Sequence, residues 1–170
     1  MTNEVNSYQF CGRATARIAR SWIEREEDPD RPVPWTPLKK PLNECTVAFI
    51  SSAGIAMLDD APFDQEGERQ NPWWGDPSYR VIPRTATENE VGVYHLHINP
   101  AFAKRDLNSV LPLQRLDELV AEGVAGRSAD AHYSFMGYIL DEQELLEKSV
   151  PQIITGLQNQ GVDAVVLVPV

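Results

Sequence analysis

Cysteine and histidine are both scarce in this chain of 170 residues, which has two of the first and three of the second. The two cysteines, Cys11 and Cys45, lie far apart and form neither a disulfide framework nor a zinc knuckle. No apolar run approaches the length of about 18 residues that a membrane-spanning helix needs. The first residues also lack the basic and apolar regions of a secretory signal. We therefore expect a soluble, cytoplasmic protein with no membrane partner.

Basic side chains are outnumbered by acidic ones, 15 against 25, which gives a formal net charge of −10. Such a negative surface disfavours nucleic acids and anionic membranes as partners, because both carry negative charge. The remaining composition, 42% apolar and 24% charged, is typical of a globular protein. The length suits one domain with a hydrophobic core of its own.

Proline concentrates near the N-terminus and divides the chain. Residues 13–27 place Ile18 and Trp22 on one stripe and predict a helix. Five prolines follow between residues 28 and 42 and indicate an extended arm. The sequence therefore predicts a helix and proline-rich arm in residues 1–42 and an α/β domain in residues 43–170.

Two apolar runs predict strands that are buried on both faces, as in parallel sheets. These runs are residues 45–50 and 162–170. Between them the pattern predicts a long loop over 59–80, with a short strand at 79–82, and then a strand over 91–98. A helix follows over 112–122, with Leu113, Leu116, Leu119 and Val120 facing inward. After it the pattern predicts a strand or ordered loop over 132–140 and two short helices divided at Ser149. This alternation predicts a three-layer α/β fold with a mostly parallel, Rossmann-like sheet.

Ligands of parallel sheets bind beyond the carboxyl ends of the strands. That rule selects residues 51–54, residues 97–99 and the position after Val170. At 51–54 the small residues Ser51, Ser52 and Gly54 let a backbone come close to a ligand. The loop could offer backbone N–H groups to a carboxylate, or it could be a plain tight turn. It lacks the G-x-G-x-x-G pattern, so a dinucleotide is not indicated.

The histidines are the second group of candidates. Period-two geometry places His95 and His97 on one face of the predicted strand, where they could line a hydrogen-bonded pocket. With His132 as a third ligand they could instead hold a metal ion. Since imidazole exchanges protons near neutral pH, His97 also suits general acid or base catalysis.

The other polar candidates have both a functional and a structural interpretation. Asp106 could orient a histidine and Asn108 could bind a carboxylate or an amide, but both residue types also cap loops. Ser134 lies in the aromatic segment 132–138, a composition more typical of a core. Neither cysteine has the basic, exposed setting that activates a thiol, so both are interpreted as structural.

Eight motifs occur in a characteristic order and spacing, at residues 47–54, 62–64, 78–83, 95–97, 105–108, 111–116, 132–138 and 161–165. Together they resemble the selenoprotein B family of glycine/sarcosine/betaine reductases, to which D-proline reductase is related. The resemblance covers about residues 36–170. It implies an oxidoreductase that reductively cleaves a C–N bond in a small amino compound, with a disulfide as acceptor.

The chemistry that the resemblance implies is nucleophilic. In that family a selenolate attacks the α-carbon and displaces the amine, which divides one hard step into two. Electrons come ultimately from thioredoxin-like dithiols, and a pyruvoyl group on a partner subunit holds primary and secondary amines as a Schiff base. The implied partners are a small amino substrate, a thioredoxin-like protein and subunits of a reductase complex. An oligomer is compatible with this organisation. No pyruvoyl-forming site is evident in the sequence of this chain.

The chain departs from the family pattern at the nucleophile. The family carries selenocysteine, or cysteine in its place, just beyond the strand that matches residues 162–170, and this chain has no such residue. We expect a selenocysteine just beyond Val170, encoded by a UGA codon read as stop, so that the fold is incomplete at its C-terminus. UAA or UAG there, with no frame continuing into a cysteine-containing helix, would contradict this expectation. No other cofactor is expected in the chain.

The resemblance carries over only supporting residues, whose roles are inferred. His97, His132 and Asp106 are assigned to catalysis, whereas substrate binding is assigned to Ser51, Ser52, Gly54, His95, Asn108 and Ser134. Two other functions stay open. One is a non-catalytic module of the same fold that binds a small ligand or a partner. The other is a metal-dependent hydrolase or lyase that uses His95, His97 and His132.

Overall fold

The structure is a computed structural model that describes residues 12–26, 36–71 and 73–170. The chain divides into two compact units, Met1–Pro37 and Leu38–Val170. In the described part of the first unit one helix forms, α1 (Arg13–Glu26), which confirms the helix predicted over 13–27. The predicted stripe of Ile18 and Trp22 and the proline-rich arm through residue 35 lie outside what the structure describes.

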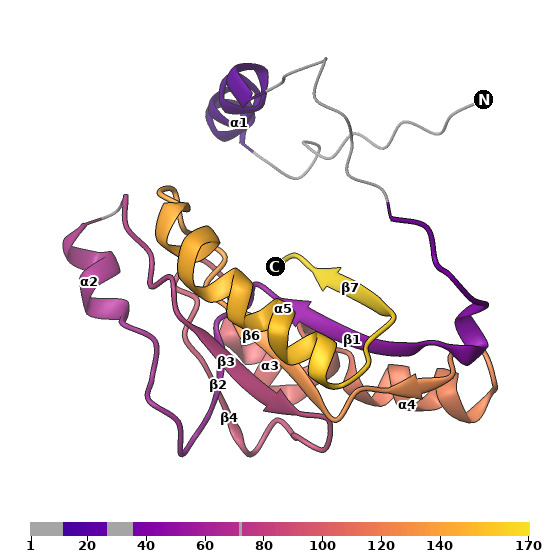
Figure 1. The fold of residues 1–170 in the computed structure, drawn as a ribbon. Helices are drawn as coiled ribbons and strands as arrows, with labels where there is room; N and C mark the ends of the chain where they lie inside the picture. Colours follow the sequence, from indigo (N-terminus) through magenta and orange to yellow (C-terminus); the bar gives the residue numbers. More distant parts are fainter. Residues whose placement is uncertain (1–11, 27–35, 72) are drawn as a thin grey trace. The chain divides into compact units, whose positions relative to one another are not determined.

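A five-stranded sheet forms the centre of the second unit (Figure 1). Strand β1 (Thr46–Ser51) pairs in parallel with β5 (Arg127–Ser128), β6 (Ala131–Phe135) and β7 (Ala164–Val168). Strand β3 (Tyr79–Pro83) joins β6 in antiparallel register. The predicted α/β class with a mostly parallel sheet is confirmed, as are the strands at 45–50 and 79–82.

Helices cover both faces of this sheet. The helical segments in the described part of this unit are η1 (Leu42–Glu44), α2 (Gln65–Gln70), α3 (Pro100–Arg105), η2 (Leu107–Ser109), α4 (Leu113–Ala121), the π-helical turn η3 (Leu145–Ser149) and α5 (Val150–Asn159). Val47 and Phe49 of β1 pack in a core with residues of α3 and α4, while Ala48, on the opposite face, packs with Ile153 and Leu157 of α5. Among the described helices none is both long and apolar enough to cross a membrane.

Helix α4 follows the predicted pattern closely. Pro112 precedes its first residue, and Gly123, at φ +74°, follows its last turn in a conformation that glycine adopts without strain. Leu113 and Leu116 are buried as predicted. Leu119 is 42% exposed, so its predicted inward position is wrong, because the helix meets the core along a narrower stripe.

The predicted strand over 91–98 is shorter in the structure. Strand β4 (Val91–Val93) pairs antiparallel with β2 (Ile55–Met57) and ends before the histidines. The N–H of Tyr94 donates to the carbonyl of Gly54 (2.8 Å), and the chain then turns toward α3. The prediction that His95 and His97 share a strand face is therefore wrong.

The segment after residue 141 forms one continuous helix rather than two. The turn η3 runs directly into α5, and the N–H of Val150 donates to the carbonyl of Leu145, five residues back. Pro151 has no N–H to donate, and the wider turn before it is a common response to such a gap. Ser149 does not cap a second helix, because its Oγ donates to the carbonyl of Pro77 (2.7 Å).

Strand β7 differs from its prediction in burial. It was expected to be buried on both faces, yet Leu167 is 70% exposed and Val165 and Val166 are also exposed. Within the described residues β7 pairs only with β1, and this leaves its other edge without a neighbouring strand.

Candidate functional site

The carboxyl end of β1 runs into a tight loop at residues 51–54. The N–H of Ser52 donates to Val168 (3.1 Å), and its Oγ accepts from the N–H of Val170 (2.9 Å). Gly54 has φ +61°, and a Cβ there would lie 2.5 Å from the Sδ of Met136. Position 54 therefore requires a glycine. It lies just after β1, beside the turn that follows β4.

The N–H groups of this loop are all engaged within the protein. Besides the bond from Ser52, the N–H of Ala53 donates to Ser51 Oγ (3.2 Å), and that of Gly54 donates to Phe135 (2.9 Å). The loop in this conformation therefore has no free N–H at residues 52–54 for a carboxylate.

Ser51 and Ser134 have structural partners. Ser51 Oγ donates to the carbonyl of Val110 (2.8 Å), and Ser134 Oγ accepts from the N–H of Ile55 (2.8 Å). Both side chains are fully buried. Their hydroxyl groups fix the backbone on either side of the loop.

His95 lies beside the loop as a buried, neutral imidazole. Its Nδ1 accepts a hydrogen bond from the N–H of His97 (3.1 Å), so the ring proton of the neutral form is on Nε2. Burial lowers the pKa of His95, which favours that neutral form. A Cβ on Gly137 would lie 2.7 Å from both His95 Nε2 and the carbonyl of Ser52. The donor side of His95 is thus close to the end of β1.

His97 contacts a buried carboxylate on α2. Its Nε2 lies 2.9 Å from Glu68 Oε1, and its ring centre lies 4.3 Å from that of Tyr138. The Glu68 side chain is only 2% exposed, whereas that of His97 is 52% exposed. The second oxygen of Glu68, Oε2, is buried and has no hydrogen-bond partner among the described residues. A buried acid thus contacts a half-exposed imidazole.

The sequence did not indicate Glu68. It falls in the segment 59–80, which was predicted as a loop, and a helix of six residues leaves little periodic signal. The available signal was Asp64, whose carboxylate accepts from the N–H of Gly67 (2.9 Å) and caps α2, followed by the helix formers Gln65 and Glu66.

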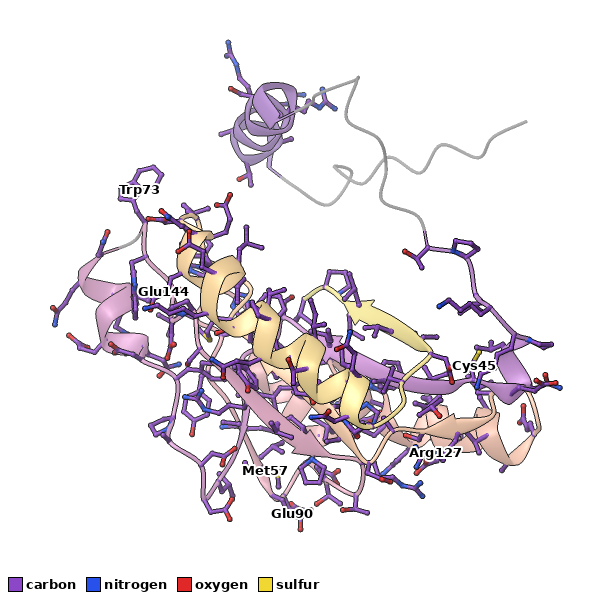
Figure 2. All side chains as sticks on the ribbon, viewed as in Figure 1. Cys45, Met57, Trp73, Glu90, Arg127 and Glu144 are labelled. Atoms are coloured by element: carbon purple, nitrogen blue, oxygen red, sulfur yellow. The ribbon has the colours of Figure 1, made fainter. Side chains whose placement is uncertain are left out.

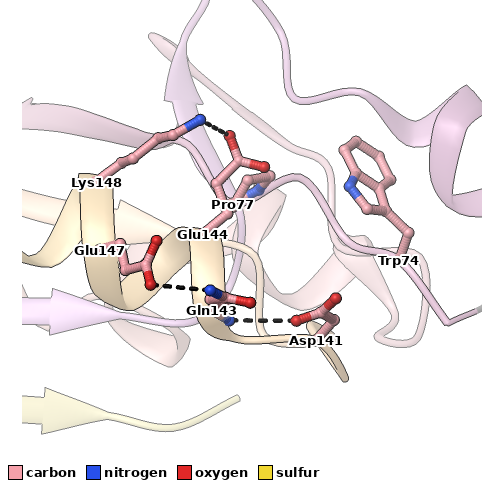
Figure 3. A pocket seen from close by; sticks show the side chains of 7 residues that line it. All are labelled: Trp74, Pro77, Asp141, Gln143, Glu144, Glu147 and Lys148. Atoms are coloured by element: carbon pink, nitrogen blue, oxygen red, sulfur yellow. Dashed lines mark hydrogen bonds and ion pairs between the residues drawn. The ribbon is translucent and has the colours of Figure 1, made fainter.

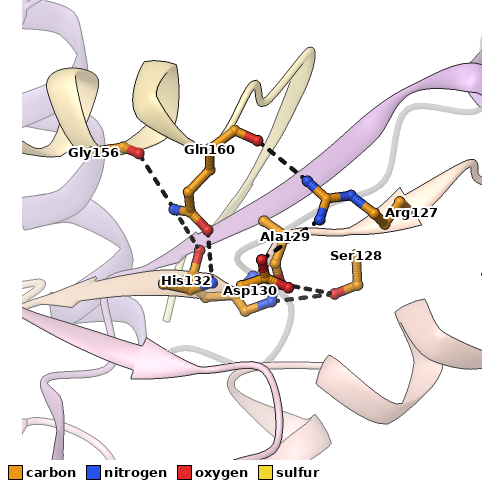
Figure 4. A network of polar contacts seen from close by, with 8 residues as sticks. Arg127, Ser128, Ala129, Asp130, His132, Gly156 and Gln160 are labelled. Atoms are coloured by element: carbon orange, nitrogen blue, oxygen red, sulfur yellow. Dashed lines mark hydrogen bonds and ion pairs between the residues drawn. The ribbon is translucent and has the colours of Figure 1, made fainter.

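His132 occupies a different environment, inside the sheet's core (Figure 4). Its Nδ1 accepts from the N–H of Phe49 (2.9 Å), and its Nε2 lies 3.3 Å from Ser128 Oγ. Burial lowers the pKa of His132 to about 4. No hydrogen bond or ring contact joins it to the other two histidines, and the described residues contain no group of three or more potential metal ligands. The three histidines therefore do not form the metal site that was one alternative.

Asp106 and Asn108 have the geometry of a loop cap. Asp106 accepts from the backbone N–H (3.0 Å) and the Nδ2 (2.8 Å) of Asn108, and these hydrogen bonds lower the pKa of Asp106. Asn108 Oδ1 in turn accepts from the N–H of Gln114 (3.1 Å) in the first turn of α4. Both side chains thus stabilise the entry to that helix.

An open pocket of roughly 280 Å³ lies between Trp74 and the segment 141–148 (Figure 3). Its charged groups are largely paired, since Lys148 binds Glu144 (2.8 Å) and Gln143 donates to Glu147 (2.9 Å). None of the predicted site residues lines it.

Cys45 is buried at the amino end of β1, next to η1 (Figure 2). Its Sγ donates to the carbonyl of Pro41 (3.3 Å). Ser52 and His95 lie at the carboxyl end of the same strand, so this thiol is not part of their site.

Three characterised relatives resemble this chain. The D-proline reductase subunit gamma of Acetoanaerobium sticklandii is 34% identical over 136 residues, which are 80% of this chain and 53% of that protein. The betaine reductase complex component B subunit beta of Peptoclostridium acidaminophilum is 29% identical over 131 residues, 75% of this chain and 28% of that protein. The glycine reductase complex component B subunit gamma of Carboxydothermus hydrogenoformans is 29% identical over 135 residues, 79% of this chain and 30% of that protein.

The chain thus spans about half the length of the first relative and less than a third of the other two. No solved structure gives a significant match. Residues 27–170 match the family described as glycine/sarcosine/betaine reductase selenoprotein B (GRDB), a range that includes the whole sheet and all three histidines. The chain belongs to the glycine/sarcosine/betaine reductase selenoprotein B family.

Proposed function

We propose that this chain is a component of a reductase that cleaves the C–N bond of a small amino compound of the glycine, sarcosine, betaine or proline type. The observation that carries the proposal is the family match, which extends over the α/β unit. The three relatives are named as subunits of D-proline, betaine and glycine reductases. Subunits of such a complex and a thioredoxin-like dithiol protein are the partners that we propose.

The site that we assign to this reaction is at the carboxyl end of β1. Substrates of this class carry a carboxylate beside the nitrogen-bearing carbon. Because the loop N–H groups at residues 52–54 are engaged, we assign carboxylate binding to the Nε2–H of His95, with Ser52 beside it. A neutral N–H donor can bind a carboxylate without adding a second buried charge.

The nucleophile comes from outside residues 38–170 in this proposal. Cys45, the cysteine of that unit, is buried at the opposite end of β1. A selenol or thiol would supply the nucleophile that forms the covalent intermediate. The chain's own residues would bind the substrate through His95 and move a proton through His97.

The experiment is a reduction assay on the native gene product, purified with its associated subunits. Glycine, sarcosine, betaine and D-proline are offered in turn with a dithiol reductant, and C–N cleavage is followed by the amine released or, for proline, by the ring-opened product. We expect dithiol-dependent cleavage of at least one of them. Absence of cleavage with all four, while ligand binding persists, would instead support the non-catalytic module.

The role of His95 is tested in the same assay. We expect His95→Asn to raise KM by about tenfold or more, because asparagine keeps an acceptor for the N–H of His97 but is too short to place a donor at the position of Nε2, so a hydrogen bond to a charged group is lost. Asn89→Ala, at an exposed turn before β4, is the control and should leave KM unchanged. An unchanged KM in the His95 variant would refute this assignment.

A further inference from the structure

The pair formed by Glu68 and His97 has an asymmetry that packing alone does not explain. Burial of a carboxylate costs several kcal/mol unless hydrogen bonds and an opposite charge compensate for it. Glu68 has one such partner, His97 Nε2, and its other oxygen is buried with none among the described residues. Orphaned buried polar atoms are rare in folded proteins and mark strain or function. A structural role would be served better by an apolar side chain of similar size.

The two ends of the His97 ring differ in their surroundings. Nε2 is held by Glu68, while no described residue forms a hydrogen bond with Nδ1. The side chain is half exposed, and the Tyr138 ring lies against it, 4.3 Å between ring centres. One nitrogen is therefore fixed by the protein, and the other is left for exchange with a ligand.

We propose that Glu68 is a positioning residue that holds His97 in the Nε2–H tautomer, so that Nδ1 is the atom that gives and takes protons. The logic is that of a buried carboxylate that orients an imidazole and fixes its tautomer. This inference rests on the proposed function and adds a proton path to it. His95 cannot serve in that role, since its Nδ1 is occupied by the N–H of His97.

The proton step balances within the proposed reaction. A selenolate or thiolate forms a bond to the substrate carbon, and the C–N bond breaks with its electron pair on nitrogen. The nitrogen takes the proton from Nδ1 of the His97 imidazolium, which leaves a neutral ring with its Nε2–H still donated to Glu68. The dithiol partner supplies the electrons that later reduce the covalent intermediate.

The first test is the tautomer of His97 in the full chain, read from long-range ¹H–¹⁵N NMR spectra in mildly alkaline solution. With three histidines in the sequence, the ring signals are few enough to assign by substitution. We expect the Nε2–H tautomer to exceed the other by about tenfold or more, as a charge-assisted hydrogen bond allows. A dominant Nδ1–H tautomer, or equal amounts of both, would overturn the proposal. This measurement needs neither a substrate nor a variant.

The second test compares Glu68→Gln with Glu66→Gln. The first replaces the carboxylate by an amide that can either accept or donate, so the tautomer preference should fall toward equal populations. Glu66 lies on the same helix but is exposed, so its variant should keep the wild-type ratio. A Glu68→Gln protein that is folded and keeps the wild-type ratio would refute the positioning role.

The activity readout separates this role from the proposed reaction. In the reduction assay we expect Glu68→Gln to lower kcat by about 10²-fold with KM within about twofold, since a proton-transfer contribution is lost while binding through His95 remains. Full activity of that variant would refute the role of Glu68 and leave the reductase intact. If the protein shows the expected tautomer but reduces none of the four substrates, the proposed reaction is refuted, and the positioning of His97 by Glu68 still holds.

Discussion

The three histidines lie in different environments because each has different neighbours. His132 has both ring nitrogens engaged inside the core, His95 has one engaged and one near the strand end, and His97 is half exposed against a buried carboxylate. Sequence reasoning identified all three as candidates because histidine is scarce, but residue type alone does not distinguish these environments. Only the fold separates a structural imidazole from one that a ligand can approach.

His132 makes the stability of the protein depend on pH. Its pKa is lowered by burial from 6.5 to about 4 in the folded state, so below pH 6.5 the unfolded chain binds a proton that the folded chain does not. The free energy of unfolding should therefore fall as the pH falls from about 6.5 to about 4, by up to about 3 kcal/mol from this group.

Urea denaturation at several pH values measures this effect. His132→Asn keeps an acceptor for the N–H of Phe49 and removes the titration, so its stability should fall less over the same pH interval. The carboxylates titrate in both proteins and cancel in the comparison. Equal pH dependence in the two proteins would show that His132 does not carry the effect.

Individual elements were predictable where one local signal dominated. The apolar run of β1 and the Pro112 and Gly123 boundaries of α4 each specify an element through local sequence. The predicted length of β4 was wrong because alternation at His95 and His97 looks the same whether the chain continues as a strand or turns. The pairing with β2 that sets the extent of β4 is long-range. Glu68 was missed for a related reason, since its burial depends on tertiary contacts of a six-residue helix.

The continuous helix from η3 into α5 depends on a contact with a distant loop. Ser149, which the capping pattern assigned to a helix start, instead donates its Oγ–H to the carbonyl of Pro77. We expect Ser149→Ala to lower the free energy of unfolding by about 1–2 kcal/mol, because that carbonyl loses its partner.

Thr155→Ala is the matched control for this contact. The Thr155 hydroxyl is exposed and bonds the carbonyl of Pro151 within the same helix, so its loss should change stability by less than about 0.5 kcal/mol. Chemical denaturation of both variants provides the comparison. A Ser149 variant as stable as the control would mean that the bond to Pro77 contributes nothing.

At the scale of the whole unit, the sequence could indicate the class of fold but not how each strand is covered. Apolar runs predict parallel strands because such strands are normally buried on both faces, and β1 fits that rule. Strand β7 has the same composition, yet its central residues are exposed. Burial of a strand depends on what packs against it, and local composition does not contain that information.

The exposed face and edge of β7 predict self-association. Among the described strands β7 pairs only with β1, and it presents Val166 and Leu167 to solvent with no charged residue in the strand. Unprotected apolar edges of this kind pair with other chains, and a lysine there prevents such pairing. We expect Leu167→Lys to lower the concentration-dependent association of the chain in sedimentation experiments while leaving Tm nearly unchanged.

Leu146→Lys adds the same charge at an exposed position on η3 and should not reduce association. Equal association in all three proteins would place the contact elsewhere, whereas loss of association in both variants would assign the effect to net charge rather than to the edge of β7.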